Sequence, residues 1–230
     1  MLKRAGLFGG TFNPVHLGHL RVAQEIKDGF SLDRMFFVLS AIPPHKPSSI
    51  IAGTIDRLEM LNRAVSTNPD FIASDMEANR PGPSYTIDTV NQFQKLHPSF
   101  SKVFLIVGID AFLEIDTWKD YRDLFDRISV IVMSRPPMHE NEAIHPAGHT
   151  GHQIDSVGEV LKQHIDPAYR YIKGKNRFEA RLRMPVRFKA VTPIGITSTM
   201  VRKLTGKSAS IRYLVPEGVA EYIEEKRLYL

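Results

Sequence analysis

The chain has 230 residues, of which 43% are apolar and 24% are charged, as in a globular protein with one sizeable α/β core. It contains no cysteine, which excludes disulfides and zinc sites built on thiolates. No apolar run approaches the roughly 20 residues of a membrane span. The charged start, Met1-Leu2-Lys3-Arg4, is followed by no signal-peptide core. We therefore expect a soluble cytoplasmic protein without membrane contact.

The formal net charge of +5 originates in one segment. Residues 170–189 contain eight lysines or arginines and a single acid, Glu179, so the remainder of the chain is slightly acidic. One interpretation is a solvated surface stretch, and the alternative is an anion-binding or nucleic-acid-binding patch. We favour the solvated surface, because no aromatic ladder and no known nucleic-acid motif accompany these charges.

Strand-like and helix-like patterns alternate along the chain. Continuous apolar runs predict buried strands, and apolar residues at helical spacing predict the helices between them. This alternation is typical of a doubly wound α/β fold with a parallel sheet, whose ligands bind beyond the carboxyl ends of the strands. In chain order we predict a strand at Ala5–Phe8, a helix at Leu20–Lys27 stopped by Gly29, a strand at Met35–Ser40, a helix at Ile55–Val65 capped by Thr54, a strand at Phe71–Met76, a helix with Ile87, Val90 and Phe93 inward that Ser84 or Thr86 caps, a strand at Val103–Val107, one or two short helices in Ala111–Phe125, a strand at Ile128–Met133, a helix at Val157–His164, a last strand at Val186–Val191, and helices at Thr197–Leu204 and Glu217–Lys226.

The pattern changes at residues 138–184, which are polar, histidine-rich and then basic. We treat them as an insertion or lid before the last strand of a single domain spanning residues 1–230. A contact within a homo-oligomer is an alternative role. The spacing of His145, His149 and His152 suits a metal only if this stretch is helical. Pro146 and two nearby glycines argue against a regular helix, so we predict no metal site.

The most informative stretch is Gly9-Gly10-Thr11-Phe12-Asn13-Pro14-Val15-His16-Leu17-Gly18-His19. It joins the first predicted strand to the first predicted helix, a junction where helix amides and the positive end of the helix dipole bind phosphates. Two histidines three residues apart at a helix start lie about one turn apart, on one side. The glycines lack a Cβ, so a bulky anion can approach the backbone. No nearby Asp, Glu or Cys completes a metal site with the histidines.

This string is neither a P-loop nor a dinucleotide-binding fingerprint, because G-x-x-x-x-G-K-[ST] and G-x-G-x-x-G are both absent. It resembles the motif of the H-x-G-H nucleotidyltransferases, which transfer a nucleotidyl group and release pyrophosphate. Ile196-Thr197-Ser198-Thr199-Met200-Val201-Arg202 is similar to the I-S-S-T-x-[IV]-R segment of that family, with Thr in place of the more usual Ser at position 197. Alone, this segment could be an ordinary capped helix. Paired with the first motif, it offers hydroxyls and Arg202 as donors to a triphosphate.

Further segments resemble the bacterial nicotinate mononucleotide adenylyltransferases within this superfamily, over residues 1–136 and 186–230. The resemblance implies a Rossmann-like nucleotidyltransferase fold and transfer of AMP from ATP to nicotinate mononucleotide, which gives deamido-NAD and pyrophosphate in NAD biosynthesis. Mg²⁺ is expected on the ATP phosphates. The segments that carry this resemblance are Pro43-Pro44-His45-Lys46, Arg57-Leu58-Glu59-Met60-Leu61, Ser84-Tyr85-Thr86-Ile87-Asp88-Thr89, Gly108-Ile109-Asp110 and Trp118.

The resemblance also implies roles for individual residues. An acceptor phosphate is already anionic, so the enzyme needs charge stabilisation and alignment and no general base. We assign that stabilisation to His16, His19, Lys46 and Arg202. ATP would be bound by Gly9, Gly10, Thr11, Phe12, His16, Gly18, His19, Gly108, Asp110, Ile196, Thr197, Ser198, Thr199 and Arg202. Nicotinate mononucleotide would be bound by Lys46, Ser84, Tyr85, Thr86, Trp118 and Arg135, with the Trp118 ring stacked on the pyridinium.

Structural alternatives exist for several of these residues. Trp118 could be a core aromatic, Arg57 a solvated helix residue, and Asp110 a helix cap, while Ser84 and Thr86 could act as caps and ligands together. The acceptor could instead be nicotinamide mononucleotide or another phosphate. From a different class, the chain could be a nucleic-acid-binding or regulatory module that uses residues 170–189, but an intact motif pair argues against a vestigial site.

Overall fold

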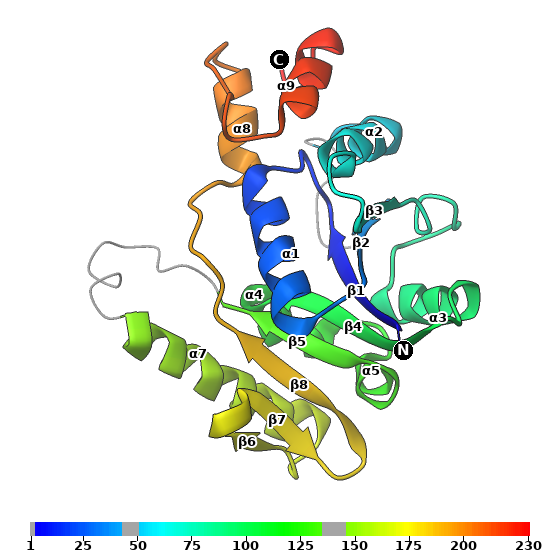
Figure 1. Cartoon of the computed structure of the whole chain (residues 1–230), viewed down its shortest axis with the longest axis vertical. Coiled ribbons are helices and arrows are strands. Elements are labelled where there is room, and N and C mark those ends of the chain that lie inside the picture. Colours follow the sequence, from blue (N-terminus) through cyan, green and yellow to red (C-terminus); the bar gives the residue numbers. More distant parts are fainter. Residues whose placement is uncertain (1–2, 43–50, 135–145) are drawn as a thin grey trace. The chain divides into compact units, whose positions relative to one another are not determined.

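The computed structural model describes residues 3–42, 51–134 and 146–230 (Figure 1). It divides into two compact units, which are treated one at a time below. The first unit comprises Met1–Gly6 and Tyr85–Pro193, and the second comprises Leu7–Ser84 and Ile194–Leu230. Within the described ranges, no helix has the length and apolar character needed to cross a membrane.

The strands are hydrogen-bonded in the order β3-β2-β1-β4-β5-β8-β7-β6. The pairs β2–β3, β4–β5 and β5–β8 are parallel, which confirms the predicted doubly wound α/β fold. The pairs β6–β7 and β7–β8 are antiparallel, so the sheet is mostly parallel with an antiparallel edge. The strands are β1 at Lys3–Gly10, β2 at Arg34–Leu39, β3 at Phe71–Ser74, β4 at Phe100–Gly108, β5 at Ser129–Met133, β6 at Arg170–Ile172, β7 at Arg177–Ala180 and β8 at Arg183–Lys189.

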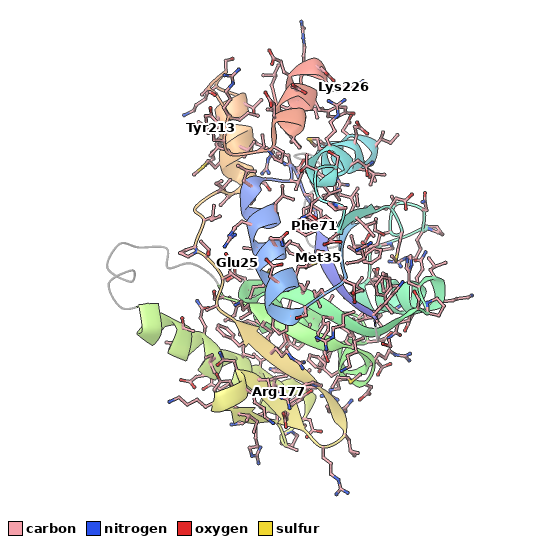
Figure 2. The ribbon with its side chains drawn as sticks, in the orientation of Figure 1. Glu25, Met35, Phe71, Arg177, Tyr213 and Lys226 are labelled. Atoms are coloured by element: carbon pink, nitrogen blue, oxygen red, sulfur yellow. The ribbon has the colours of Figure 1, made fainter. Side chains whose placement is uncertain are left out.

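In the described part of the second unit, four helices each bury apolar side chains. Ala23 and Ile26 are buried on α1, as their helical spacing predicts. On the neighbouring strands β2 and β3, the paired residues Met35 and Phe71 are both buried and are marked in Figure 2. Helices α2 and α9 lie side by side (Figure 1). The four helices are α1 at Leu17–Phe30, α2 at Thr54–Val65, α8 at Ser198–Thr205 and α9 at Glu217–Glu225.

The other helices of the described residues belong to the first unit. Its α3 buries Ile87, Val90 and Phe93, as predicted. The predicted short helices between residues 111 and 125 are confirmed as α4 and α5 with a 3-10 turn between them. A Cβ on Gly158 of α7 would lie 3.0 Å from the Phe178 ring, so this glycine lets α7 approach β7 closely. The helices are α3 at Thr86–Leu96, α4 at Ile109–Leu113, α5 at Tyr121–Arg127 and α7 at Pro146–Val160.

The polar segment from residue 138 to 184 is more regular than its composition predicts. Its described part, from Pro146 onward, forms α7, a π-helical turn at Leu161–Ile165, and the strands β6 and β7. The prediction that proline and glycine prevent a helix near His149 and His152 was therefore wrong. Pro146 is the first residue of α7, a position where a missing N–H costs nothing. His139 and His145 lie outside the described residues, and among those described no group of three His, Cys, Asp or Glu could hold a metal.

Several predicted helix ends differ from the observed ones. Helix α1 passes Gly29 and ends at Phe30, with Ser31 in a left-handed conformation at φ 49°. Thr54 is the first residue of α2 and does not cap it, and Tyr85 rather than Ser84 or Thr86 precedes α3 without a side-chain cap. The Ser84 hydroxyl instead accepts from the backbone N–H of Ala41 at 3.1 Å.

Arg57 on α2 is 1% exposed, so the interpretation as a solvated helix residue was wrong. Burial lowers the pKa of its guanidinium, and the charge is retained because the N–H groups meet oxygen acceptors. These acceptors follow β1 and β2 or lie at or just before the start of α2, so one side chain joins three segments. They are the carbonyls of Thr11, Ser40, Ala41 and Ala52 and the hydroxyl of Thr54, at 2.6 to 3.2 Å.

We expect Arg57→Met to lower the free energy of unfolding by about 3 kcal/mol, because it leaves buried carbonyls without donors. Urea denaturation measures this loss. The matched control is Arg21→Met, which breaks an exposed pair with Glu25 and should cost less than about 1 kcal/mol. Equal losses in the two variants would contradict the assigned role of Arg57.

Candidate active site

The loop between β1 and α1 is held in shape by aromatic packing. Phe12 has a positive φ of 44° and is 2% exposed, and its ring packs edge-on against Phe8 at 5.9 Å and His19 at 5.2 Å. A Cβ on Gly10 would lie 2.8 Å from the Phe12 ring, so only glycine fits there. At Gly9, which is exposed, no described atom lies within 4 Å of the Cβ position. The predicted approach of an anion to the backbone is therefore sterically open at Gly9.

The two histidines of the motif lie together at the start of α1. His16 precedes the first helical residue and His19 lies one turn further, with ring centroids 3.7 Å apart. The predicted placement on one side is confirmed. The backbone N–H of His16 donates to Nδ1 of His19 at 3.2 Å. Because Nδ1 accepts, the neutral His19 ring carries its proton on Nε2, which makes Nε2 a hydrogen-bond donor.

His16 is 7% exposed, and its Nδ1 has no hydrogen-bond partner among the described residues. Burial lowers the pKa of His16 to about 4, so its imidazole is neutral at pH 7. A Cβ on Gly18 would lie 3.0 Å from Nδ1 of His16, so the missing Cβ makes room for this ring. His16 can therefore offer a polar ring nitrogen to a ligand, and it adds no positive charge at rest.

The second motif is hydrogen-bonded to the same loop. The hydroxyl of Ser198 donates to the carbonyl of Pro14 at 2.8 Å, and Nη1 of Arg202 donates to the carbonyl of Asn13 at 2.8 Å. Thr197 caps α8 by accepting from Met200 N–H at 3.0 Å. The segment is thus a capped helix, and two of its side chains hydrogen-bond to the loop of the first motif.

Two helix starts therefore meet one loop in the second unit. Helices α1 and α8 both lack an acidic residue in the first turn, so no first-turn carboxylate neutralises the positive ends of their dipoles. Ile196, Thr199 and the exposed Gly195 precede or begin α8 on the same unit. Amide groups, hydroxyls and one guanidinium at two helix starts form a donor-rich site that suits a polyphosphate.

The residues predicted to bind the acceptor divide between the units. Ser84 belongs to the second unit, whereas Tyr85, Thr86 and Trp118 belong to the first. Trp118 is half-buried and is not part of the core, so the core-aromatic alternative was wrong. Thr86 begins α3. Lys46 and Arg135 lie outside the described residues, and their predicted phosphate contacts stay predictions.

Lys119 was missed by the sequence analysis, although it links the two acceptor segments of the first unit. Its Nζ lies 3.1 Å from a carboxylate oxygen of Asp88 in the first turn of α3 and 5.0 Å from the Tyr85 ring centroid. These contacts bring the start of α3 next to the residue that follows Trp118. Two features of the sequence could have indicated it. A lysine directly follows a conspicuous Trp, and an acid, Asp88, lies in the first turn of a predicted helix.

Gly108 and Asp110 lie at the carboxyl end of β4, as predicted. Gly108 precedes α4, and no described atom lies within 4 Å of its Cβ position. Asp110 is exposed within the first turn of α4, while Gly108 occupies the cap position, so the interpretation of Asp110 as the cap was wrong. An exposed carboxylate beside an open backbone is accessible to ligand hydroxyls.

The basic segment is partly neutralised within the first unit. Arg177 pairs with Glu179, and Arg183 pairs with Asp126 and lies 3.8 Å from Asp166. Arg177 lies on β7 (Figure 2). The exposed cations are Arg170, Lys173, Lys175 and Arg181.

The comparisons with known proteins agree with this geometry. The family model described as cytidylyltransferase-like matches residues 7–204. A protein of Geobacter sp. (strain M21) named "Probable nicotinate-nucleotide adenylyltransferase" is 40% identical and covers 99% of this chain and 98% of its own. A protein of Geobacter metallireducens with the same name is 36% identical, with 98% of each chain covered.

Among solved structures, the fold is similar to nicotinic acid mononucleotide adenylyltransferase of Plasmodium falciparum complexed with NaAD, with a TM-score of 0.68 and 16% identity. That match covers 99% of this chain and 97% of the other. The same Plasmodium protein complexed with APC gives a TM-score of 0.66 and 15% identity over the same shares. At this level of identity, the similarity concerns the fold alone.

We expect His16 to make the protein less stable in acid. Its folded pKa of about 4 lies below the ordinary histidine pKa of 6.5, so its contribution is complete above pH 6.5 and is lost as the pH falls toward 4. The loss should reach about 3 kcal/mol of unfolding free energy. Urea melts of wild type and His16→Gln at pH 7 and pH 4 measure it. The control variant His152→Gln alters an exposed ring and should lose as much unfolding free energy between pH 7 and pH 4 as wild type. An equal loss in His16→Gln would refute the assignment to His16.

Proposed function

The chain belongs to the cytidylyltransferase-like family, and we propose that it transfers AMP from ATP to nicotinate mononucleotide, producing deamido-NAD and pyrophosphate. Relatives at 36% and 40% identity over nearly the whole chain are named for nicotinate-nucleotide adenylyl transfer. The observation that carries the proposal is the joining of α1 and α8 at one loop, through Ser198 with Pro14 and Arg202 with Asn13.

The reaction joins two anions, so alignment and charge stabilisation dominate its barrier. A phosphate oxygen of the mononucleotide attacks the α-phosphorus of ATP, and the β-phosphate oxygen leaves with pyrophosphate. The nucleophile is already deprotonated near pH 7, and therefore no side chain has to remove a proton. His19 donates from Nε2 to a phosphate oxygen, because its Nδ1 is held by the backbone N–H of His16.

The neighbouring groups complete this donor set. Amides at the starts of α1 and α8 are proposed to bind the same anion, and Arg202 adds a permanent positive charge. Its Nη1 and Nη2 already bond to Asn13 and Thr199, which fixes the orientation of the guanidinium. We propose that Lys46 contacts the transferred phosphates and that Asp110 accepts from the adenosine ribose hydroxyls. Gly108 keeps its proposed role in ATP binding.

Mg²⁺ would be bound through the oxygens of the triphosphate. In the described ranges no cluster of three His, Asp or Glu side chains could hold it, and the donors at this site are N–H and O–H groups. The chain's own residues are therefore proposed to act on phosphate oxygens directly.

The acceptor is proposed to be the acid form of the mononucleotide. The start of α3 at Thr86 offers backbone amides to a carboxylate, and Lys119 adds a cation beside Tyr85. The half-buried Trp118 ring, one residue before Lys119, offers a stacking surface to the pyridinium.

Pyrophosphate release from ATP, with Mg²⁺ present, tests the function. We expect release with nicotinate mononucleotide, and a kcat/KM at least tenfold lower with nicotinamide mononucleotide, because the amide loses a charge-assisted hydrogen bond. Absence of release with every phosphate acceptor would refute the proposal.

His19→Ala should lower kcat by about a hundredfold or more while the thermal midpoint stays close to wild type.

We expect Trp118→Ala to raise the KM for nicotinate mononucleotide about tenfold, because stacking on the pyridinium is lost. The KM for ATP should stay within about twofold, since the adenosine is assigned to other residues. Steady-state kinetics with each substrate varied measures both values. Tyr213→Ala, which removes an aromatic ring that is 86% exposed, is the matched control. An unchanged mononucleotide KM would remove Trp118 from the acceptor site.

A further inference from the structure

We propose that Tyr229, near the end of the chain, is a positioning residue for the loop that carries His16 and His19. The inference rests on the proposed function, because it assigns Tyr229 a part in phosphate binding by that loop. The hydroxyl of Tyr229 donates to Oδ1 of Asn13 at 2.8 Å, across 216 positions of sequence. Asn13 lies three residues before His16, within the motif itself.

Asn13 is the point where the loop is joined to distant parts of the second unit. It is 5% exposed, and its Oδ1 also accepts from the backbone N–H of Ala52 at 3.1 Å. Its carbonyl accepts from Nη1 of Arg202 at 2.8 Å. One asparagine therefore holds the segment before α2, helix α8 and the chain end in fixed relation to the histidines.

The local backbone around Tyr229 indicates that its position is enforced by its surroundings. Arg227 and Tyr229 have positive φ values of 49° and 66°, a region that residues other than glycine enter only where the surrounding structure imposes it. The Tyr229 ring lines a cavity of about 420 Å³ together with Arg202 and Ala52. The chain end is thus folded back onto the residues that hold the loop.

The phenol of Tyr229 is also held in its donor form. Burial raises its pKa above the ordinary value, and the nearby Asp56 acts in the same direction, while Arg202 and Arg57 oppose them. The hydroxyl consequently keeps its proton near neutral pH. A phenylalanine at this position would preserve the ring and remove only the donor.

The loss of that donor should act on catalysis through the loop. Asn13 would be less firmly held, and the donor atoms of the histidine pair would move relative to the phosphates. We expect Tyr229→Phe to lower kcat about tenfold. The KM for the mononucleotide should stay within about twofold, because Thr86 and Trp118 belong to the first unit. A residue that serves only stability would change the thermal midpoint without lowering kcat at an unchanged KM.

The matched control is Tyr222→Phe. Tyr222 is buried in the second unit and donates from its hydroxyl to a carboxylate oxygen of Asp56 at 2.9 Å, whereas Tyr229 donates to Asn13 of the loop. We expect Tyr222→Phe to lower the thermal midpoint and to leave kcat unchanged. A kcat of Tyr229→Phe within about twofold of wild type would overturn the proposal, as would an equal fall in both variants.

Backbone hydrogen exchange of residues 11–16 separates this inference from the proposed function. Exchange there should be about tenfold faster in Tyr229→Phe than in wild type and unchanged in Tyr222→Phe, whatever the acceptor. Faster exchange with a wild type that releases no pyrophosphate would refute the proposed function and keep the anchoring of the loop. Unchanged exchange in Tyr229→Phe would refute the anchoring itself.

Discussion

The buried guanidinium of Arg57 is the constraint on which the second unit depends. A charge taken out of water is tolerated only when its N–H groups all find strong acceptors, and here the acceptors are backbone carbonyls that follow β1 and β2 and precede α2. These segments must therefore converge on one point. Because the motif loop begins at that point, the position of His16 and His19 follows from the satisfaction of a buried cation.

The electrostatics of the site differ from what its residue types suggest. Two histidines beside an arginine predict a strongly cationic pocket, but His16 is neutral because burial lowers its pKa to about 4. In the proposed site, much of the attraction for phosphate would come instead from N–H dipoles at the starts of α1 and α8, which are already oriented. Fixed dipoles need no reorganisation as charge develops on the leaving pyrophosphate, so they suit a reaction without proton abstraction.

The sequence predicted those elements whose signal is local. The uninterrupted apolar runs of β1, β2, β4 and β5 indicate buried strands by themselves. β6 and β7 were missed because their arginines obscure a period-two pattern, in which Tyr171 and Phe178 pair on one face. Arg57 was misjudged although it shares the buried face of α2 with residues 60, 61, 64 and 65. Charge was taken as exposure, although helical spacing placed Arg57 inward.

The geometry of the histidine pair was predictable, because a spacing of three residues at a helix start places both rings on one side. The distant residues that hold the loop in place were not predictable. Tyr229, Ser198, Arg202 and Arg57 all donate to oxygens of residues 11–14, and each comes from a remote segment that only tertiary packing brings there. In all four bonds the distant side chain donates and an oxygen of the loop accepts, a pattern that neither motif shows in the sequence. They occupy carbonyl and amide oxygens of the loop, whose lone pairs would repel a phosphate. The distant residues thus help to make the loop selective for anions by binding its acceptors.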